Sequence, residues 1–182
     1  MTESAGIYAL NADNRESNGR MKTLVLGLGN PILSDDGVGP RVAGELEGKF
    51  DESVTVAEAS LAGLNLLDLL VGYDRAIIID AIQTAGGKVG NIYHLEPEAF
   101  QSTRHAVSTH DINLATALEF GKRLGLKLPQ KIDILAIEVA DINCFSEECT
   151  PEVAKAVPVC AEMIIEKLKA GGITRTGDTT YD

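Results

Sequence analysis

Short apolar runs alternate along this chain with longer stretches in which apolar residues have helical spacing. The lack of polar alternation in the clearest of these runs is typical of parallel strands buried on both faces of a sheet. Apolar residues that recur every three or four positions predict helices between the strands. The predicted strands cover residues 23–27, 54–59, 75–80 and 131–138, and the predicted helices begin after residue 37, at 64, at 111 and at about 151.

A further strand is predicted over residues 88–95, directly after a turn of two glycines. It follows the preceding strand too closely for a helical crossover, so we expect it to run antiparallel to its neighbour. Thr150 followed by Pro151 predicts the start of the last helix, because a hydroxyl at the N-cap and a proline at the first helical position both favour helix initiation. Two glycines after residue 170 predict its end.

This alternation predicts an α/β fold with three layers, in which helices cover both faces of a twisted sheet. The sheet should hold about five strands, mainly parallel, with one antiparallel strand. A chain of 182 residues is the usual length of one domain. We assign residues 21–170 to this domain, residues 1–20 to a polar, disordered extension, and residues 171–182 to a flexible tail.

Charge and composition narrow the possible partners. The formal charge is −11, with 16 basic against 27 acidic residues, a balance that disfavours nucleic acid as a partner. No apolar run approaches the ~18 residues of a membrane span, so we expect a soluble protein. The first twenty residues have no apolar signal-peptide core, and three cysteines are an odd number. Both observations favour a reducing cytoplasm over a secreted, disulfide-bonded protein.

Polar side chains that could carry chemistry follow three of the predicted elements. Asp35 and Asp36 lie in the glycine-rich loop after the first strand, Asp80 ends the third strand, and His110 comes just before a helix. Loops at the carboxyl ends of parallel strands meet in a common crevice. Two carboxylates and one imidazole suit a borderline divalent metal such as nickel or zinc. An open coordination position would then bind a substrate atom or a water.

Each of these residues also has a structural interpretation. Asp80 could simply accept hydrogen bonds from loop amides, and His110 could be a helix cap or a surface residue. One of Asp35 and Asp36 can cap the following helix while the other points into the crevice. The residues alone do not choose between the two, but the three groups together favour a site over three separate structural roles.

Other motifs give weaker signals. Gly27 and Gly29 follow a strand as in a dinucleotide-binding loop, but Ile32 stands where the third glycine would be. Cys144 and Cys149 do not match a common zinc spacing, and Cys160 falls on the apolar side of the last helix. His94, within a predicted strand, and His105, in a polar loop, are interpreted as surface residues.

Four sequence blocks resemble the hydrogenase maturation endopeptidase family. They are Leu-Val-Leu-Gly-Leu-Gly-Asn-Pro-Ile-Leu-Ser-Asp-Asp-Gly-Val-Gly at 24–39, Leu-Ala-Gly-Leu at 61–64, Ile-Ile-Asp-Ala at 78–81, and Ser-Thr-His-Asp at 108–111. The first block is long and specific, and the others follow in the order typical of the family. The resemblance extends over residues 22–169, which is nearly the whole predicted domain.

The resemblance implies a phosphorylase/hydrolase-like fold and an endopeptidase that removes the C-terminal extension of a nickel-iron hydrogenase large-subunit precursor. Family members recognise nickel already inserted in that precursor, so the metal is carried by the substrate rather than resident. By resemblance, the nickel-contacting roles fall on Asp36, Asp80 and His110. The first-loop position is often Glu in the family, and Asp36 is one methylene shorter. The family is grouped with aspartic-type peptidases, which makes Asp36 and Asp80 the catalytic candidates.

Two alternatives from other classes are considered. Peptidyl-tRNA hydrolases share the strand followed by Gly-Leu-Gly-Asn-Pro but require a Thr-Arg-His-Asn segment soon after it. Here Thr103-Arg104-His105 lies in the other half of the chain and is not followed by Asn. The second alternative is a module that senses metal and binds a partner without cutting it, which an activity assay separates from a peptidase.

Overall fold

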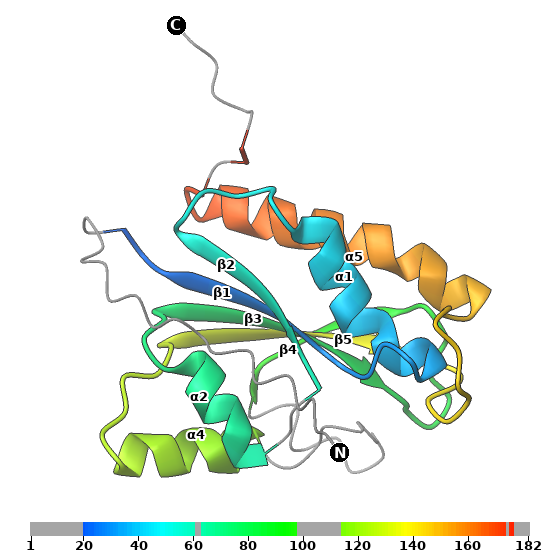
Figure 1. Ribbon diagram of the computed structural model, residues 1–182, viewed down its shortest axis with the longest axis horizontal. Helices are drawn as coiled ribbons and strands as arrows, with labels where there is room; N and C mark the ends of the chain where they lie inside the picture. Colours follow the sequence, from blue (N-terminus) through cyan, green and yellow to red (C-terminus); the bar gives the residue numbers. More distant parts are fainter. Residues whose placement is uncertain (1–19, 61–62, 98–113, 174, 177–182) are drawn as a thin grey trace, which may run out of the picture.

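The computed structural model describes residues 20–60, 63–97, 114–173 and 175–176. Strands and helices alternate along this part of the chain, as predicted (Figure 1). In chain order the elements are β1 (Thr23–Leu28), the 3-10 helix η1 (Ser34–Gly37), α1 (Val38–Leu46), β2 (Val54–Ala59), the 3-10 helix η2 (Gly63–Asn65), α2 (Leu66–Leu70), β3 (Arg75–Ile82), β4 (Ile92–Leu95), α4 (Leu114–Arg123), β5 (Lys131–Glu138) and α5 (Pro151–Ala170).

The five strands form one sheet in the order β2-β1-β3-β5-β4. β1 pairs in parallel with β2 and β3, and β3 pairs in parallel with β5, whereas β4 runs antiparallel to β5. The predicted α/β fold, with a mainly parallel sheet and one antiparallel strand, is therefore confirmed. We call the edge of the sheet at which the four parallel strands end the carboxyl edge.

Strand β4 begins later than predicted, and it does not pair with β3, the strand that precedes it in the chain. Residues 88–91 form a turn instead of strand, in which the Asn91 N–H donates to the Lys88 carbonyl at 3.0 Å. Gly90 adopts φ +87° there, a conformation that favours glycine. The strand proper starts at Ile92 and pairs with β5 rather than β3.

Side chains that alternate along the strands build two separate cores. Odd-numbered residues of β1, β3 and β5 pack against α1 and α5, and even-numbered ones pack against α2 and α4. The helix pairs lie on opposite faces of the sheet (Figure 1). Representative residues of the first core are Val25, Ile77, Leu135 and Ile164, and of the second Leu26, Ile78, Ile134 and Leu70.

Two glycines let the start of α1 lie directly on the backbone of the sheet. A Cβ added to Gly39 would lie 2.1 Å from the Leu28 carbonyl oxygen and 2.7 Å from that of Ile79. A Cβ on Gly27 would lie 2.3 Å from the Gly39 carbonyl oxygen. These distances are far below van der Waals contact, so Gly27 and Gly39 are required for the close packing of α1 on the sheet.

A buried ionic cluster lies at the opposite, amino end of the sheet. Asp133 accepts hydrogen bonds from Arg75 at 3.0 Å and from Lys167 at 3.0 Å, and its other contact is His94 Nε2 at 2.8 Å. Burial works to raise the pKa of Asp133, but the three partners outweigh it and lower that pKa to about 2. His94 is half-exposed, as the surface interpretation requires, yet it also anchors β4 to this cluster.

Among the described residues, no helix is both long and apolar enough to cross a membrane. The predicted extension and tail lie largely outside the described residues. In the described part of the tail, Arg175 forms an antiparallel bridge with Phe50, and the Thr176 N–H donates to the Lys49 carbonyl at 2.8 Å.

Candidate functional site

The strand order places a topological switch point between β1 and β3. From β1 the chain continues to β2 on one side, and from β3 it continues toward β5 on the other. The loops after these two strands therefore diverge at the carboxyl edge, which is the usual place for a ligand crevice in an open α/β sheet. The first loop carries Asp35 and Asp36, and β3 carries Asp80.

Asp80 lies inside β3, not at its end as predicted. The strand continues to Ile82 because its pairing with β5 extends to Ile82 opposite Glu138. Pairing with β1 stops earlier, at Gly27 opposite Ile79. Asp80 is thus the first residue of β3 beyond its pairing with β1, and this position places it at the switch point.

Asp80 is 3% exposed, and its Oδ1 accepts a hydrogen bond from the Ala81 N–H at 2.9 Å. By strand alternation it shares a face with Ala76 and Ile78, the face covered by α2 and α4. Burial of a carboxylate at a crevice is costly unless it has partners. This makes Asp80 the residue of β3 best placed for site chemistry.

Asp35 ties two loops of the carboxyl edge together. Its Oδ2 accepts hydrogen bonds from the Ala140 and Asp141 N–H groups and the Thr150 hydroxyl, each at 3.0 Å, and its Oδ1 accepts one from the Thr150 N–H at 2.6 Å. The side chain is fully buried. Thr150 precedes Pro151 at the start of α5, as predicted, but its hydroxyl donates to Asp35 instead of capping its own helix.

Asp36 faces the tip of the loop that leaves β1. Its Oδ2 accepts a hydrogen bond from the Asn30 N–H at 2.8 Å, and the side chain is 1% exposed. Its backbone packs so tightly against Gly29 that a Cβ there would lie 1.9 Å from the Asp36 carbonyl oxygen. The two neighbouring acids therefore have different surroundings. Asp35 binds the loop between β5 and α5, whereas Asp36 binds Asn30 within its own loop.

The third predicted site residue, His110, lies outside the described residues, as does the Thr103-Arg104-His105 segment. The structure places Asp80 at the switch point and Asp36 in the loop that follows β1, and the assignment of Asp36, Asp80 and His110 to one site stays a prediction. Among the described residues, no three His, Cys, Asp or Glu side chains form a group that could hold a metal ion. The described part of the site supplies carboxylate oxygens.

Sequence analysis missed a further buried carboxylate at the carboxyl edge. Glu138 is 2% exposed and accepts hydrogen bonds from the Thr84 N–H at 2.7 Å and the Thr84 hydroxyl at 2.8 Å. A Cβ on Gly87 would lie 2.2 Å from its carboxyl carbon. Glu138 thus fixes the turn after β3. The sequence did contain a feature that could have identified Glu138: it is an acidic residue at the end of a predicted buried strand, the same feature that made Asp80 a candidate.

None of the three thiols has the lowered pKa of a nucleophilic cysteine. Burial raises the pKa of Cys160 to about 12 and also raises that of Cys149, while a hydrogen bond to Asp141 raises the pKa of Cys144. Cys160 belongs to the core on the α5 side, as predicted. The geometry favours carboxylate chemistry over thiolate chemistry.

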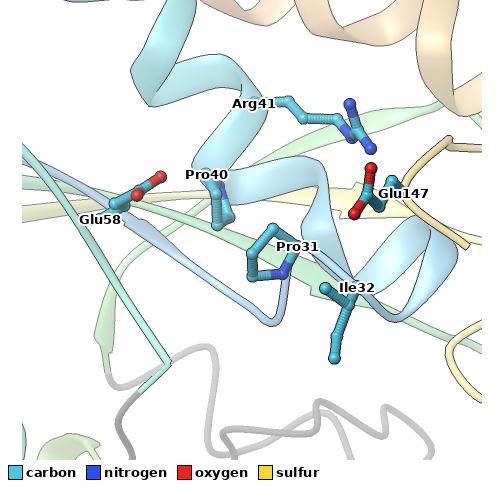
Figure 2. A pocket seen from close by; sticks show the side chains of 6 residues that line it. All are labelled: Pro31, Ile32, Pro40, Arg41, Glu58 and Glu147. Atoms are coloured by element: carbon cyan, nitrogen blue, oxygen red, sulfur yellow. The ribbon is translucent and has the colours of Figure 1, made fainter. Parts of the chain in front are cut away.

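An open cavity of about 370 Å³ adjoins the first loop at the carboxyl edge (Figure 2). We call it the edge cavity. Its walls come from the loop after β1, the start of α1, the end of β2 and the loop before α5. The lining residues are Pro31, Ile32, Pro40, Arg41, Glu58 and Glu147.

Comparison with known proteins identifies the family. Over residues 40–167 the sequence matches the hydrogenase maturation protease family, and this range includes Asp80 and His110 and begins after Asp36. The chain belongs to this family. It is therefore a peptidase by family, and the match does not favour the peptidyl-tRNA hydrolase or non-catalytic alternatives.

Individual relatives agree in sequence and structure. The hydrogenase 2 maturation protease of Escherichia coli is 26% identical over 156 residues, which cover 84% of this chain and 94% of that protein. The structure of the hydrogenase maturating endopeptidase HybD from E. coli matches with a TM-score of 0.73 at 26% identity, covering 85% of this chain and 96% of that one. The [NiFe] hydrogenase maturation protease HybD from Thermococcus kodakarensis gives a TM-score of 0.62 at 25% identity, over 81% and 99% of the chains.

Proposed function

We propose that this protein is the endopeptidase that removes the C-terminal extension of a nickel-iron hydrogenase large-subunit precursor after nickel has been inserted. The observation that supports this most directly is the match to the hydrogenase maturation protease family, in a chain whose Asp80 lies at the switch point between β1 and β3 and whose Asp36 lies in the loop after β1. The three cysteines are free, which is consistent with action in the reducing cytoplasm.

In this proposal Asp36, Asp80 and His110 contact the nickel that the precursor carries. Asp35 is the weaker candidate because four hydrogen bonds already engage both of its oxygens. Asp36 faces Asn30 at the tip of the first loop, and Asp80 lies just beyond the pairing of β3 with β1; on this basis we assign both to the proposed crevice. Carboxylate and imidazole ligands suit nickel that already has other ligands in the substrate.

The metal contact would position the scissile peptide bond at the carboxyl edge, where correct placement lowers the barrier to hydrolysis. A carboxylate next to that bond can accept a proton from the attacking water, whose oxygen adds to the carbonyl carbon. The proton then passes to the departing amine as the peptide bond breaks. Asp36 and Asp80 are the acids proposed for this role.

The test compares purified precursor with and without nickel, and follows loss of the C-terminal peptide by gel shift and mass spectrometry. We expect cleavage of the nickel-loaded precursor only. Asp80→Asn and His110→Ala should each abolish cleavage while the variants keep the wild-type circular dichroism spectrum. Asp68→Asn is the matched control, because Asp68 is exposed on α2. Normal cleavage by Asp80→Asn or His110→Ala would refute the site, and efficient cleavage of nickel-free precursor would refute the nickel requirement.

A further inference from the structure

We propose that two exposed apolar residues at the carboxyl edge, Ile32 and Phe145, together with the edge cavity beside them, form the surface on which the precursor docks. The occupant is an extended segment of the precursor next to the scissile bond, with an apolar side chain followed or preceded by a cationic one. This inference rests on the proposed function and names the part of the protein that selects the substrate. We call the pair the Ile32–Phe145 rim.

The rim is exposed but its backbone is fixed. The side chain of Phe145 is 84% exposed and that of Ile32 is 47% exposed. Leu33 and Ser146 form a parallel bridge, in which the Ser146 N–H donates to the Ile32 carbonyl at 3.1 Å and the Ser34 N–H donates to the Ser146 carbonyl at 2.8 Å. The two loops are therefore joined directly beneath the two apolar side chains.

Hydrogen bonds on both sides of Phe145 hold its loop in place. The Asp141 carboxylate accepts from the Asn143 N–H at 2.9 Å and the Cys144 N–H at 3.1 Å. On the other side, the Ser146 hydroxyl accepts from the Glu148 N–H at 3.0 Å. An aromatic side chain on a preorganised backbone loses little entropy on binding, which is the property of an interface anchor.

The edge cavity adds a charged neighbour to this apolar surface. Pro31, Ile32 and Pro40 form its apolar wall, and Figure 2 shows Arg41, Glu58 and Glu147 around it. In the described part of the chain, neither Glu58 nor Glu147 has an ion pair with Lys or Arg. Two carboxylates against one guanidinium leave the cavity with an excess negative charge, and the whole chain carries −11. A cationic side chain is the complementary group.

The rim is continuous with the candidate active site. Ile32 lies two residues from Asn30, whose N–H holds Asp36, and Phe145 belongs to the loop that Asp35 ties down at Asp141. A segment bound on the rim would therefore lie beside the first-loop carboxylate. Leu124 is also exposed, but it directly follows α4 and precedes the amino end of β5, so it lies away from the carboxyl edge.

The experiment measures both binding and cleavage of nickel-loaded precursor by the full-length protein. Phe145→Ala should raise KM and the dissociation constant about tenfold, with kcat unchanged, as expected for loss of an interface anchor. Phe145→Leu should recover most of the affinity, because it keeps an apolar side chain. Leu124→Ala removes a side chain that is 59% exposed and should leave both constants at wild-type values. Melting curves check that every variant is folded.

The double variant Glu58→Gln, Glu147→Gln tests whether the negative charge of the edge cavity binds a cationic side chain of the precursor. It should raise KM several-fold at low salt and lose most of the salt dependence that wild type shows, because screening acts on charges that the variant lacks. An unchanged KM for Phe145→Ala would overturn the docking surface, and an unchanged salt dependence would overturn the cationic occupant. Binding by wild type without cleavage would refute the proposed function and leave the docking surface standing. Absence of both binding and cleavage would refute both.

Discussion

Replacement of Asp35 by Asn tests whether this buried acid is a structural clamp rather than a metal ligand. The substitution keeps the shape of the side chain but turns one acceptor oxygen into a donor. Asp35 accepts four hydrogen bonds, three on Oδ2 and one on Oδ1, and is fully buried. An Asn side chain has one acceptor oxygen, so it can accept hydrogen bonds only at the position of Oδ1 or at that of Oδ2. Its NH₂ group then faces at least one backbone N–H.

The magnitude follows from these bonds. In the better orientation, Asn keeps its oxygen near Ala140 and Asp141, loses the bond from the Thr150 N–H, and weakens the remaining bonds from charged to neutral strength. A hydrogen bond to a charged group contributes about 1.5–3 kcal/mol against about 1 kcal/mol for a neutral one. The sum is about 3–5 kcal/mol of unfolding free energy, which for a domain of this size lowers Tm by about 10 °C.

The assay is thermal unfolding at pH 7, followed by circular dichroism, with chemical denaturation to obtain the free energy of unfolding. Asp68→Asn on α2 is the control and should shift Tm by about 1 °C or less, since surface changes have small effects. A shift of only about 2 °C for Asp35→Asn would contradict the clamp, because at least one buried donor would then have to be satisfied in another way.

Three further predictions concern other parts of the molecule. Because its pKa is lowered to about 2, ionised Asp133 stabilises the fold above the ordinary carboxyl pKa, and this stabilisation is lost as pH falls toward 2. Asp133→Asn should therefore lower Tm at pH 7 and reduce the fall in Tm between pH 4 and pH 2. A fall in Tm as steep as that of wild type would contradict the role of the cluster. Gly39→Ala should lower the free energy of unfolding by more than about 3 kcal/mol or prevent folding. Gly44 lies in the same helix, and a Cβ added there meets nothing within 4 Å, so Gly44→Ala should raise the free energy of unfolding by about 0.5–1 kcal/mol. Denaturant titration measures both changes. Deletion of residues 1–20 should change Tm by less than a few degrees, because this segment has too little apolar content to offset the entropy cost of ordering it. A larger loss would show that the extension packs on the domain.

The sequence alone determined most elements, because local pattern governs them. Residues 54–59 and 131–138 were predicted as strands with the bounds that the structure shows. The starts of β1 and β3 were also predicted, because strands that are buried throughout leave an almost uninterrupted apolar signature. Thr150 and Pro151 likewise marked the start of α5 correctly, since helix initiation depends on a few adjacent residues.

Tertiary structure decided where strands end and which strand is a neighbour. β3 runs to Ile82 because β5 pairs with it that far, and β4 starts only at Ile92, where pairing with β5 begins. These bounds depend on hydrogen bonds to segments distant in sequence. The position of Asp80, inside its strand but just beyond the pairing with β1, follows from the same pairing.

The separation of Asp35 from Asp36 shows the same limit at the candidate site. The two residues are adjacent and chemically identical, so the residue pattern places both in the loop after β1 without choosing between them, and only the family resemblance favours Asp36. The partners that engage Asp35 come from residues 140, 141 and 150, more than a hundred positions away, whereas Asp36 accepts a hydrogen bond from Asn30 in its own loop. Local pattern predicted the loop and its acids, but only the packing of the loop after β5 against it decided which acid is the clamp, because hydrogen bonds between distant segments leave no signature in either segment alone.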